Sequence, residues 1–215
     1  LELEEILAHR PEQVAGLEQV AFIQCVRKPG EVEYCSRTCC TNTMKNALRI
    51  KLLNPDCQVF VLYRDIITYG FREAYYTEAR EKGVMFVRYD EDHMPEVREN
   101  ERGELELIVL EPSLREEIVL QPDLLSLSMA LEPSEGTEKL ARILGVPLSS
   151  EGFFLESHIK MRPMDFAREG IFVCGMAHYP KFVEECMISA QAAAGRAITL
   201  LTTHRLFVGG VVSEV

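Results

Sequence analysis

Short apolar runs alternate with amphipathic stretches along most of this chain. The runs have the length of buried strands, and they lie at residues 20–24, 58–63, 84–88, 123–131 and 170–174. The stretches around them carry apolar side chains at helical spacing, at residues 1–9, 41–53, 71–82, 133–144 and 183–201. Strands that alternate with helices predict an α/β fold with a mostly parallel sheet.

Two further apolar stretches depart from this alternation. Residues 105–110 and 117–120 flank Pro112-Ser113, which predicts an antiparallel hairpin, and the polar residues 90–103 before them are expected to form a loop. The predicted fold class is therefore α/β and Rossmann-like. It has a mostly parallel sheet with helices on both faces and an antiparallel hairpin insert.

The pattern also predicts how the chain is organised. Four segments are expected: an N-terminal helix and linker at 1–19, a Rossmann-like domain at 20–131, the C-terminal part of a cofactor-binding domain at 132–203, and a loose tail at 204–215. Gly175 follows the last apolar run directly, in a position where ligands commonly bind to α/β sheets. His178 and Tyr179, just after it, are expected in a surface turn.

Composition narrows the possible functions. The 215 residues are 47% hydrophobic and 27% charged, which is typical of a globular protein and not of a disordered one. The net charge of −11 argues against nucleic acid and anionic membranes as partners. No apolar run reaches the ~18 residues of a membrane-spanning helix, and the acidic start is unlike a signal peptide.

The seven cysteines carry the strongest chemical information. Their odd number, in a chain long enough to fold without disulfides, indicates a reducing compartment such as the cytoplasm. Four of them, Cys25, Cys35, Cys39 and Cys40, fall within sixteen residues, between a predicted strand and a predicted helix. The other three, Cys57, Cys174 and Cys186, lie singly in apolar surroundings and are expected to be packing residues.

The cysteine segment lies where a dinucleotide-binding unit would have Gly-x-Gly-x-x-Gly, and Gly30 alone cannot supply that pattern. Four thiolates in one loop need a positive charge, which zinc or an iron–sulfur cluster provides. The adjacent pair Cys39-Cys40 and the absence of Cys-x-x-Cys favour a cluster over zinc. Empty reduced thiols or a redox disulfide remain as a third interpretation.

Over nearly its whole length, and most clearly in two motifs, the chain resembles the flavoprotein component of heterodisulfide reductase, its A subunit. One motif runs from the strand 20–24 into Cys25, then through Tyr34-Cys35-Ser36-Arg37, Cys39-Cys40 and Lys45. The other runs from Arg162-Pro163 through 170–175 to Pro180-Lys181 and an Ala-rich helix. The resemblance implies a thioredoxin-reductase-like core of the pyridine nucleotide-disulfide oxidoreductase type.

The resemblance also implies cofactors and roles. The four clustered cysteines would hold a [4Fe-4S] cluster beside FAD, with electrons passing to partner subunits or electron carriers. Lys45 would act on the flavin as the catalytic residue, since a nearby cation can stabilise a reduced anionic flavin. Flavin contacts are expected at Gly175, Met176, Ala177 and Lys181.

Two hypotheses follow. In the first, the chain is the electron-transfer part of such a flavoprotein; because it has no Gly-x-Gly-x-x-Gly turn, we expect a fragment that holds FAD weakly or not at all. In the second, it is a non-catalytic α/β domain that is stabilised by a bound metal, binds partner subunits and holds no flavin. If part of the protein is missing, the apolar faces of the helices at 1–9 and 183–201 should be exposed to solvent. The chain should then form a homodimer through one of these helices.

Overall fold

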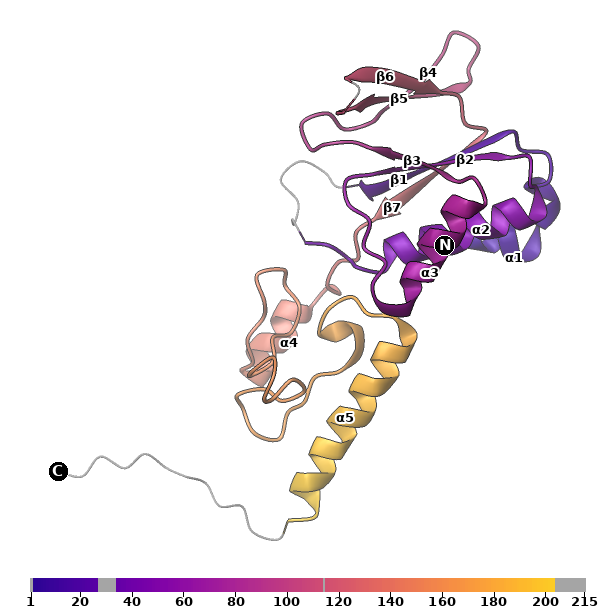
Figure 1. Cartoon of the computed structure of the whole chain (residues 1–215). Coiled ribbons are helices and arrows are strands. Elements are labelled where there is room, and N and C mark those ends of the chain that lie inside the picture. Colours follow the sequence, from indigo (N-terminus) through magenta and orange to yellow (C-terminus); the bar gives the residue numbers. More distant parts are fainter. Residues whose placement is uncertain (1, 27–33, 114, 204–215) are drawn as a thin grey trace. The chain divides into compact units, whose positions relative to one another are not determined.

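The computed structural model describes residues 2–26, 34–113 and 115–203 (Figure 1). Contacts divide the chain into two compact units, Leu1–Ala130 and Leu131–Val215. The tail expected at 204–215 and residues 27–33 of the cysteine segment lie outside the described residues.

A four-stranded parallel sheet forms the centre of the first unit. Its strands are β1 (Gln19–Val26), β2 (Gln58–Tyr63), β3 (Met85–Arg88) and β7 (Leu124–Met129), in the order β3-β2-β1-β7. Residues Val20 to Gln24 of β1 are all buried, because the strand has a neighbour on each side and a packed layer on each face. The predicted parallel sheet is confirmed.

Three helices cover one face of this sheet: α1 (Glu2–His9), α2 (Cys39–Leu53) and α3 (Glu73–Glu81). Short 3₁₀ turns at Pro11–Gln13 and Gly70–Arg72 precede β1 and α3. Met44, Ala47 and Ile50 of α2 recur at helical spacing and pack with Phe22 and its neighbours in the sheet.

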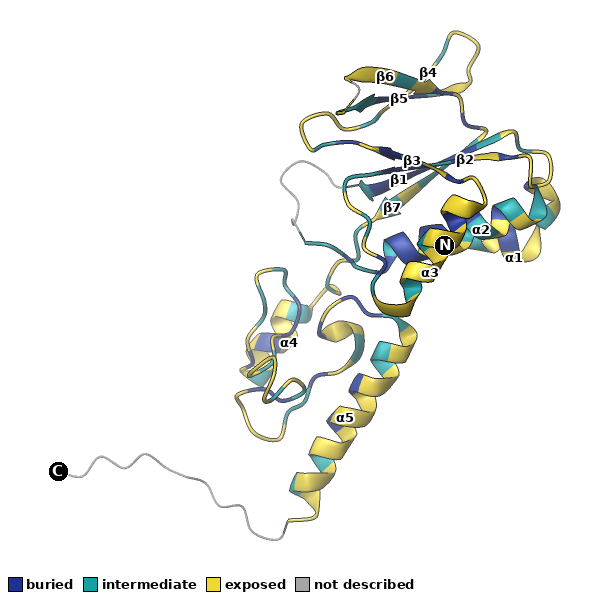
Figure 2. Cartoon of the chain, in the orientation of Figure 1, coloured by how far each residue is buried: buried dark blue, intermediate teal, exposed yellow. Residues whose placement is uncertain are grey.

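The expectation of a bare first helix is wrong. Leu3 and Leu7 are only 8% and 5% exposed, because α1 packs its apolar side into the same core (Figure 2).

Within the described residues of the first unit, the other face of the sheet packs against a second sheet and not against helices, which corrects the predicted helices on both faces. This antiparallel sheet has the order β4-β5-β6, with β4 (Glu96–Glu99), β5 (Leu105–Glu111) and β6 (Glu116–Leu120). The predicted hairpin is β5 and β6, and β4 arises within the expected loop. Leu107 and Val109, two residues apart on β5, pack against Ala21 and Ile23 of β1.

The second unit has less regular structure. It contains α4 (Thr137–Leu144), a 3₁₀ turn at Gly175–Ala177 and α5 (Val183–Leu201). The strand expected at 170–174 is not formed: Phe172 makes a single bridge to Asp165, with no longer ladder to extend it. A small apolar core of Ala141, Phe166 and neighbouring side chains holds this unit.

We predict that the core around β1 dominates the stability of the first unit. Phe22→Ala removes a side chain that is 1% exposed and should lower the free energy of unfolding by about 3–5 kcal/mol, because it leaves a cavity. Phe71→Ala is the matched control, since Phe71 is 99% exposed and its loss should change stability by less than about 0.5 kcal/mol. Urea unfolding followed by circular dichroism measures both; equal losses would contradict the core assignment.

Candidate functional site

Cys25 lies where the regular path of β1 ends. The pairing of β1 with β7 shifts register between Ile23 and Val26, and Cys25 adopts a left-handed backbone with φ of 56°. Arg37, between Cys35 and Cys39, is also left-handed, with φ of 62°. Such a conformation costs a non-glycine residue about 1–2 kcal/mol, so the surrounding contacts must hold it. Strained backbone conformations of this kind are often found at functional sites.

Two of the other three cysteines begin α2, and Cys35 lies four residues before it. Cys39 and Cys40 are its first two residues, and Cys40 is 1% exposed, with its Sγ 3.8 Å from the carbonyl oxygen of Asp65. The backbone N–H of Arg37 donates to Cys35 Sγ at 3.3 Å. The partial positive charge of a helix N-terminus favours negative sulfur at these positions.

The structure brings the four thiols together. Cys25, Cys35 and Cys39 line one small cavity of about 10 Å³, together with Ser128 and Met129 of β7. Cys40 interacts electrostatically with the thiols of Cys25 and Cys35, and directly with that of Cys39. The side chains fill the space between them, so they must turn apart to hold a bulky group.

Burial, and then the neighbouring Cys39, raises the pKa of the Cys25 thiol. The hydrogen bond between Cys39 and Cys40 raises the pKa of Cys39 and lowers that of Cys40. Burial and the neighbouring thiols therefore oppose the formation of four thiolates here without added positive charge.

The donor set consists of four thiols, which are ligands for both zinc and iron–sulfur clusters. Within residues 2–26, 34–113 and 115–203, no three His, Cys, Asp or Glu side chains converge as ligands of one ion. A tetrahedral zinc site needs sulfurs about 3.8 Å apart, given its bond length of about 2.3 Å. An iron–sulfur cluster accepts four thiolates at wider spacing around several irons.

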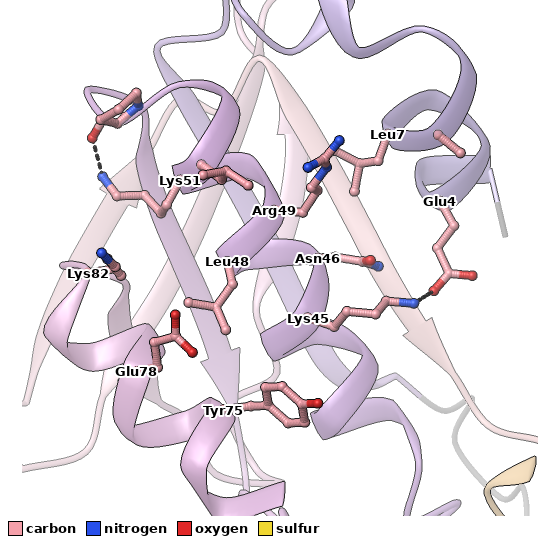
Figure 3. A pocket seen from close by; sticks show the side chains of 13 residues that line it. Glu4, Leu7, Lys45, Asn46, Leu48, Arg49, Lys51, Tyr75, Glu78 and Lys82 are labelled. Carbon is pink, nitrogen blue, oxygen red and sulfur yellow. Dashed lines mark hydrogen bonds and ion pairs between the residues drawn. The ribbon is translucent and has the colours of Figure 1, made fainter.

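Lys45 does not face the cysteine cavity. It lies five residues after Cys40, which places it roughly 140° around the helix. Its side chain forms an ion pair with Glu4 of α1 and lines an open cleft of about 770 Å³ among α1, α2 and α3 (Figure 3). Arg49 and Tyr75 line the same cleft.

The turn at Gly175 is held by the helix that follows it. Gly175 has φ of 63°, a conformation that suits glycine, and its N–H donates to Ser189 Oγ of α5 at 2.9 Å. The backbone donor that could meet a flavin is therefore already satisfied. Met176 is 46% exposed, and the carbonyl of Ala177 accepts from the N–H of Phe154.

Sequence reasoning missed a buried polar network in this turn. His178 is 7% exposed and not in a surface turn as expected, and its Nε2 lies 2.7 Å from Glu156 Oε2. Its Nδ1 is 2.9 Å from Lys181 Nζ, which also donates to the carbonyl of Gly175. Because an ammonium only donates, Nδ1 accepts, and the ring proton lies on Nε2 and faces Glu156.

The pKa of His178 is lowered by burial, against the opposing effect of Glu156. The partners Glu156 and His178 are 22 residues apart in sequence, so no local pattern indicated them.

A second ion cluster fixes the segment that leads into the turn. Asp165, 2% exposed, accepts from Nε and Nη2 of Arg196 on α5 and from Arg162. Burial alone would raise the pKa of this carboxyl, but the two guanidinium groups outweigh it and hold the pKa below its usual value. The adjacent Met164 accepts a backbone hydrogen bond from Val173, two residues before Gly175.

No protein-family model matches the chain, but its sequence is similar to those of several heterodisulfide reductase A subunits. The chain is 39% identical over 86% of its length to the A subunit of ferredoxin:CoB-CoM heterodisulfide reductase from Methanosarcina acetivorans. It is 37% identical over 86% to the iron-sulfur A subunit of CoB–CoM heterodisulfide reductase from Methanocaldococcus jannaschii. A protein of Archaeoglobus profundus that is named as similar to the heterodisulfide reductase A subunit is 34% identical over 92%.

The chain spans 23%, 29% and 28% of those three relatives. Among solved structures, thioredoxin reductase of T. acidophilum matches 92% of this chain with a TM-score of 0.59 and 12% identity, over 57% of its own length. Thioredoxin reductase of Lactococcus lactis matches 84% with a TM-score of 0.52 and 14% identity, over 53% of its own length. These structural matches show that the fold is thioredoxin-reductase-like.

We predict that the ion pairs of Asp165 with Arg162 and Arg196 stabilise the second unit in a pH-dependent way. Asp165→Asn should lower its free energy of unfolding by about 2 kcal/mol at pH 7, because hydrogen bonds to a charged acceptor are lost. Because the pKa of Asp165 is lowered in the folded state, its stabilising effect is complete above the unfolded-state pKa of about 3.9. The difference from wild type should therefore shrink as the pH falls below about 4 toward the lowered folded-state pKa. Urea unfolding at several pH values measures this.

Glu169→Gln is the control for Asp165→Asn. Glu169 also pairs with Arg162, but its side chain is 66% exposed, so its effect should stay below about 0.5 kcal/mol. A pH-independent loss in Asp165→Asn would show that the charge is not what stabilises the unit.

Proposed function

The chain is similar to the A subunit of heterodisulfide reductase over most of its length, and we propose that it is the electron-transfer part of such a flavoprotein. A 4Fe-4S cluster would be held by Cys25, Cys35, Cys39 and Cys40. The observation that carries the proposal is the gathering of these four thiols at the end of β1 and the start of α2. When bound, the cluster supplies one-electron transfer.

Two features support a cluster at this place. All seven cysteines are free thiols, so the four are not consumed by disulfides. The relative from Methanocaldococcus jannaschii is called an iron-sulfur subunit.

The flavin part of the proposal rests on the second unit. The thioredoxin-reductase-like fold and the motif around Gly175 support an FAD contact there. Since the N–H of Gly175 is bonded to Ser189, the contact would come from the exposed side of Met176 and Ala177. Lys181 would contribute a buried positive charge beside the turn.

Lys45 stays a proposed flavin contact on the strength of its place after the cysteine motif. To reach a flavin it would have to leave Glu4, with which it is paired.

A second candidate function is that of a non-catalytic domain, stabilised by the bound cluster, that binds partner subunits and no flavin. The satisfied N–H of Gly175 and the pairing of Lys45 with Glu4 favour it, because these two of the candidate flavin contacts are engaged within the chain. The two functions share the cluster and differ in whether flavin binds near Met176.

The proposed partners are other heterodisulfide reductase-like subunits or electron carriers. The relatives are named as one subunit of a larger enzyme, and the chain is acidic, with a net charge of −11.

Homodimerisation through α5 remains part of the proposal, supported by exposed side chains such as Met187 at 60% and Ile188 at 65%. None of the described helices has both the length and the hydropathy to cross a membrane.

We predict that anaerobic reconstitution with iron and sulfide yields about four iron and four sulfide per chain. Serine at any one of the four clustered cysteines should reduce bound iron by more than about half, because an alcohol is a poor substitute for a thiolate ligand. Cys174→Ser is the control and should retain full iron, since Cys174 is exposed, belongs to the second unit and is not among the residues that line the cavity. Iron and sulfide analysis decides; undiminished iron in the four variants would remove the ligand assignment.

We predict weak flavin binding by the 215-residue chain. FAD should be lost on gel filtration, because the sequence lacks the Gly-rich turn that lets a backbone approach the pyrophosphate. In a titration, however, the chain should quench flavin fluorescence saturably. Met176→Glu should weaken that binding about tenfold, a loss of about 1.4 kcal/mol, by placing an anion at the contact.

Met161→Glu is the control for the flavin titration, because Met161 is 80% exposed in the same unit and is not a proposed contact. Stoichiometric FAD after gel filtration would contradict the weak-binding prediction. Equal weakening in both variants would contradict the Met176 site, and an absence of quenching would favour the docking function.

A further inference from the structure

A chain of buried hydrogen bonds leads from the core to the cysteine cavity. Gln24 of β1 is fully buried, and its Nε2 donates to Thr43 Oγ1 of α2 at 2.6 Å. Thr43 Oγ1 lies 3.3 Å from Ser128 Oγ of β7. Ser128 in turn lines the cavity with Cys25, Cys35 and Cys39. Three elements of the first unit thus contribute one polar side chain each.

The chemistry of the three groups favours one direction for this chain. An amide nitrogen only donates, so the Thr43 oxygen accepts from Gln24. Between Thr43 and Ser128, either hydroxyl can be the donor. Thr43 is 4% exposed, and a buried hydroxyl proton without an acceptor costs about 1–3 kcal/mol, a cost that donation to Ser128 Oγ avoids. In that direction the proton of Ser128 is left to donate to another group.

Two unpaired polar atoms belong to residues that adjoin the clustered cysteines in sequence. In the part of the chain that the structure describes, three buried side-chain oxygens lack a hydrogen-bond partner, and two of them belong to Gln24 and Thr41. Gln24 directly precedes Cys25, and Thr41 directly follows Cys40. Buried polar atoms are almost always bonded, so this pair is consistent with a segment whose polar contacts are completed by a bound group.

We propose that the Ser128 hydroxyl, aligned by Gln24 and Thr43, donates a hydrogen bond to a sulfur of the cluster and raises its reduction potential. The inference rests on the proposed function, since it requires a cluster at the four cysteines. Reduction adds one electron and makes the sulfurs more negative, so a donor at that position stabilises the reduced form more than the oxidised one. Ser128 tunes the cluster and is not one of its ligands.

The test is a potentiometric titration of the reconstituted chain with dithionite, followed by electron paramagnetic resonance. At the wild-type midpoint, Ser128→Ala should lower the ratio of reduced to oxidised cluster about threefold to tenfold, the effect of one net hydrogen bond. Ser126→Ala is the matched control: it changes the same residue type two positions earlier on β7, outside the cavity lining, and should leave the ratio unchanged.

Thr43→Val provides a second, nearly isosteric variant that does not alter Ser128. It should lower the ratio in the same direction by a smaller factor, and Thr43→Ser should restore it. These variants keep the inference testable even if Ser128→Ala folds poorly.

Each outcome separates this inference from the proposed function. Full iron content with an unchanged ratio in Ser128→Ala overturns the inference and leaves the cluster in place. An equal shift in Ser126→Ala overturns it as well, because the effect would then belong to the strand and not to the donor. A wild-type chain that takes up no cluster overturns the proposed function, and the inference with it.

Discussion

Strand β1 is buried on both faces, and that burial decides where the chemistry of this chain can lie. Along Val20 to Ile23 the side chains alternate between the helical layer and the second sheet, and both layers accept only apolar groups. Polar side chains become possible at the carboxyl end, where Gln24 and Cys25 lie. The register shift with β7 at that point frees Cys25 from the ladder.

The same burial makes it unfavourable for the four clustered cysteines to ionise together. Thiols that are partly withdrawn from water resist ionisation, and each thiolate that forms makes the next one less favourable. The start of α2 offers partial positive charge, but not enough for four thiolates. The proposed cluster of iron and sulfide would supply the missing positive charge, and the strained backbone at Cys25 and Arg37 is consistent with a segment shaped for it.

The sequence predicted the features that depend on local pattern and on strand order. Apolar runs identify β1 and β2, and the carboxyl-end rule brings Cys25 toward the start of α2, as the structure shows. That these cysteines ligate a metal remains a prediction.

Features that depend on distant partners were not predicted. Every residue of β4 (Glu96–Glu99) is exposed, so its pairing with β5 leaves no apolar period to detect. Residues 170–174 are apolar enough for a strand, but a strand needs a neighbour, and Phe172 has a single bridge. The Glu156–His178–Lys181 network joins residues across a span that no periodicity covers.

The two units are stabilised by different means, and this gives them different responses to acid. The first is held by two apolar cores, whose stabilisation does not depend on proton binding. The second has a small core and two buried ionic groupings, at Asp165 and at His178. Because the pKa of His178 is lowered, the unfolded chain binds a proton at this residue more readily than the folded one, and stability falls as the pH drops below about 6.5.

The carboxyl groups act at lower pH. Those of Glu156 and Asp165 have lowered pKa values, so their contribution holds until the pH falls below about 4. The turn at Gly175 lies between these groupings in sequence and is bonded to one of them through Lys181. Mild acid therefore loosens the proposed flavin contact before it affects the apolar core that supports the cysteine cavity.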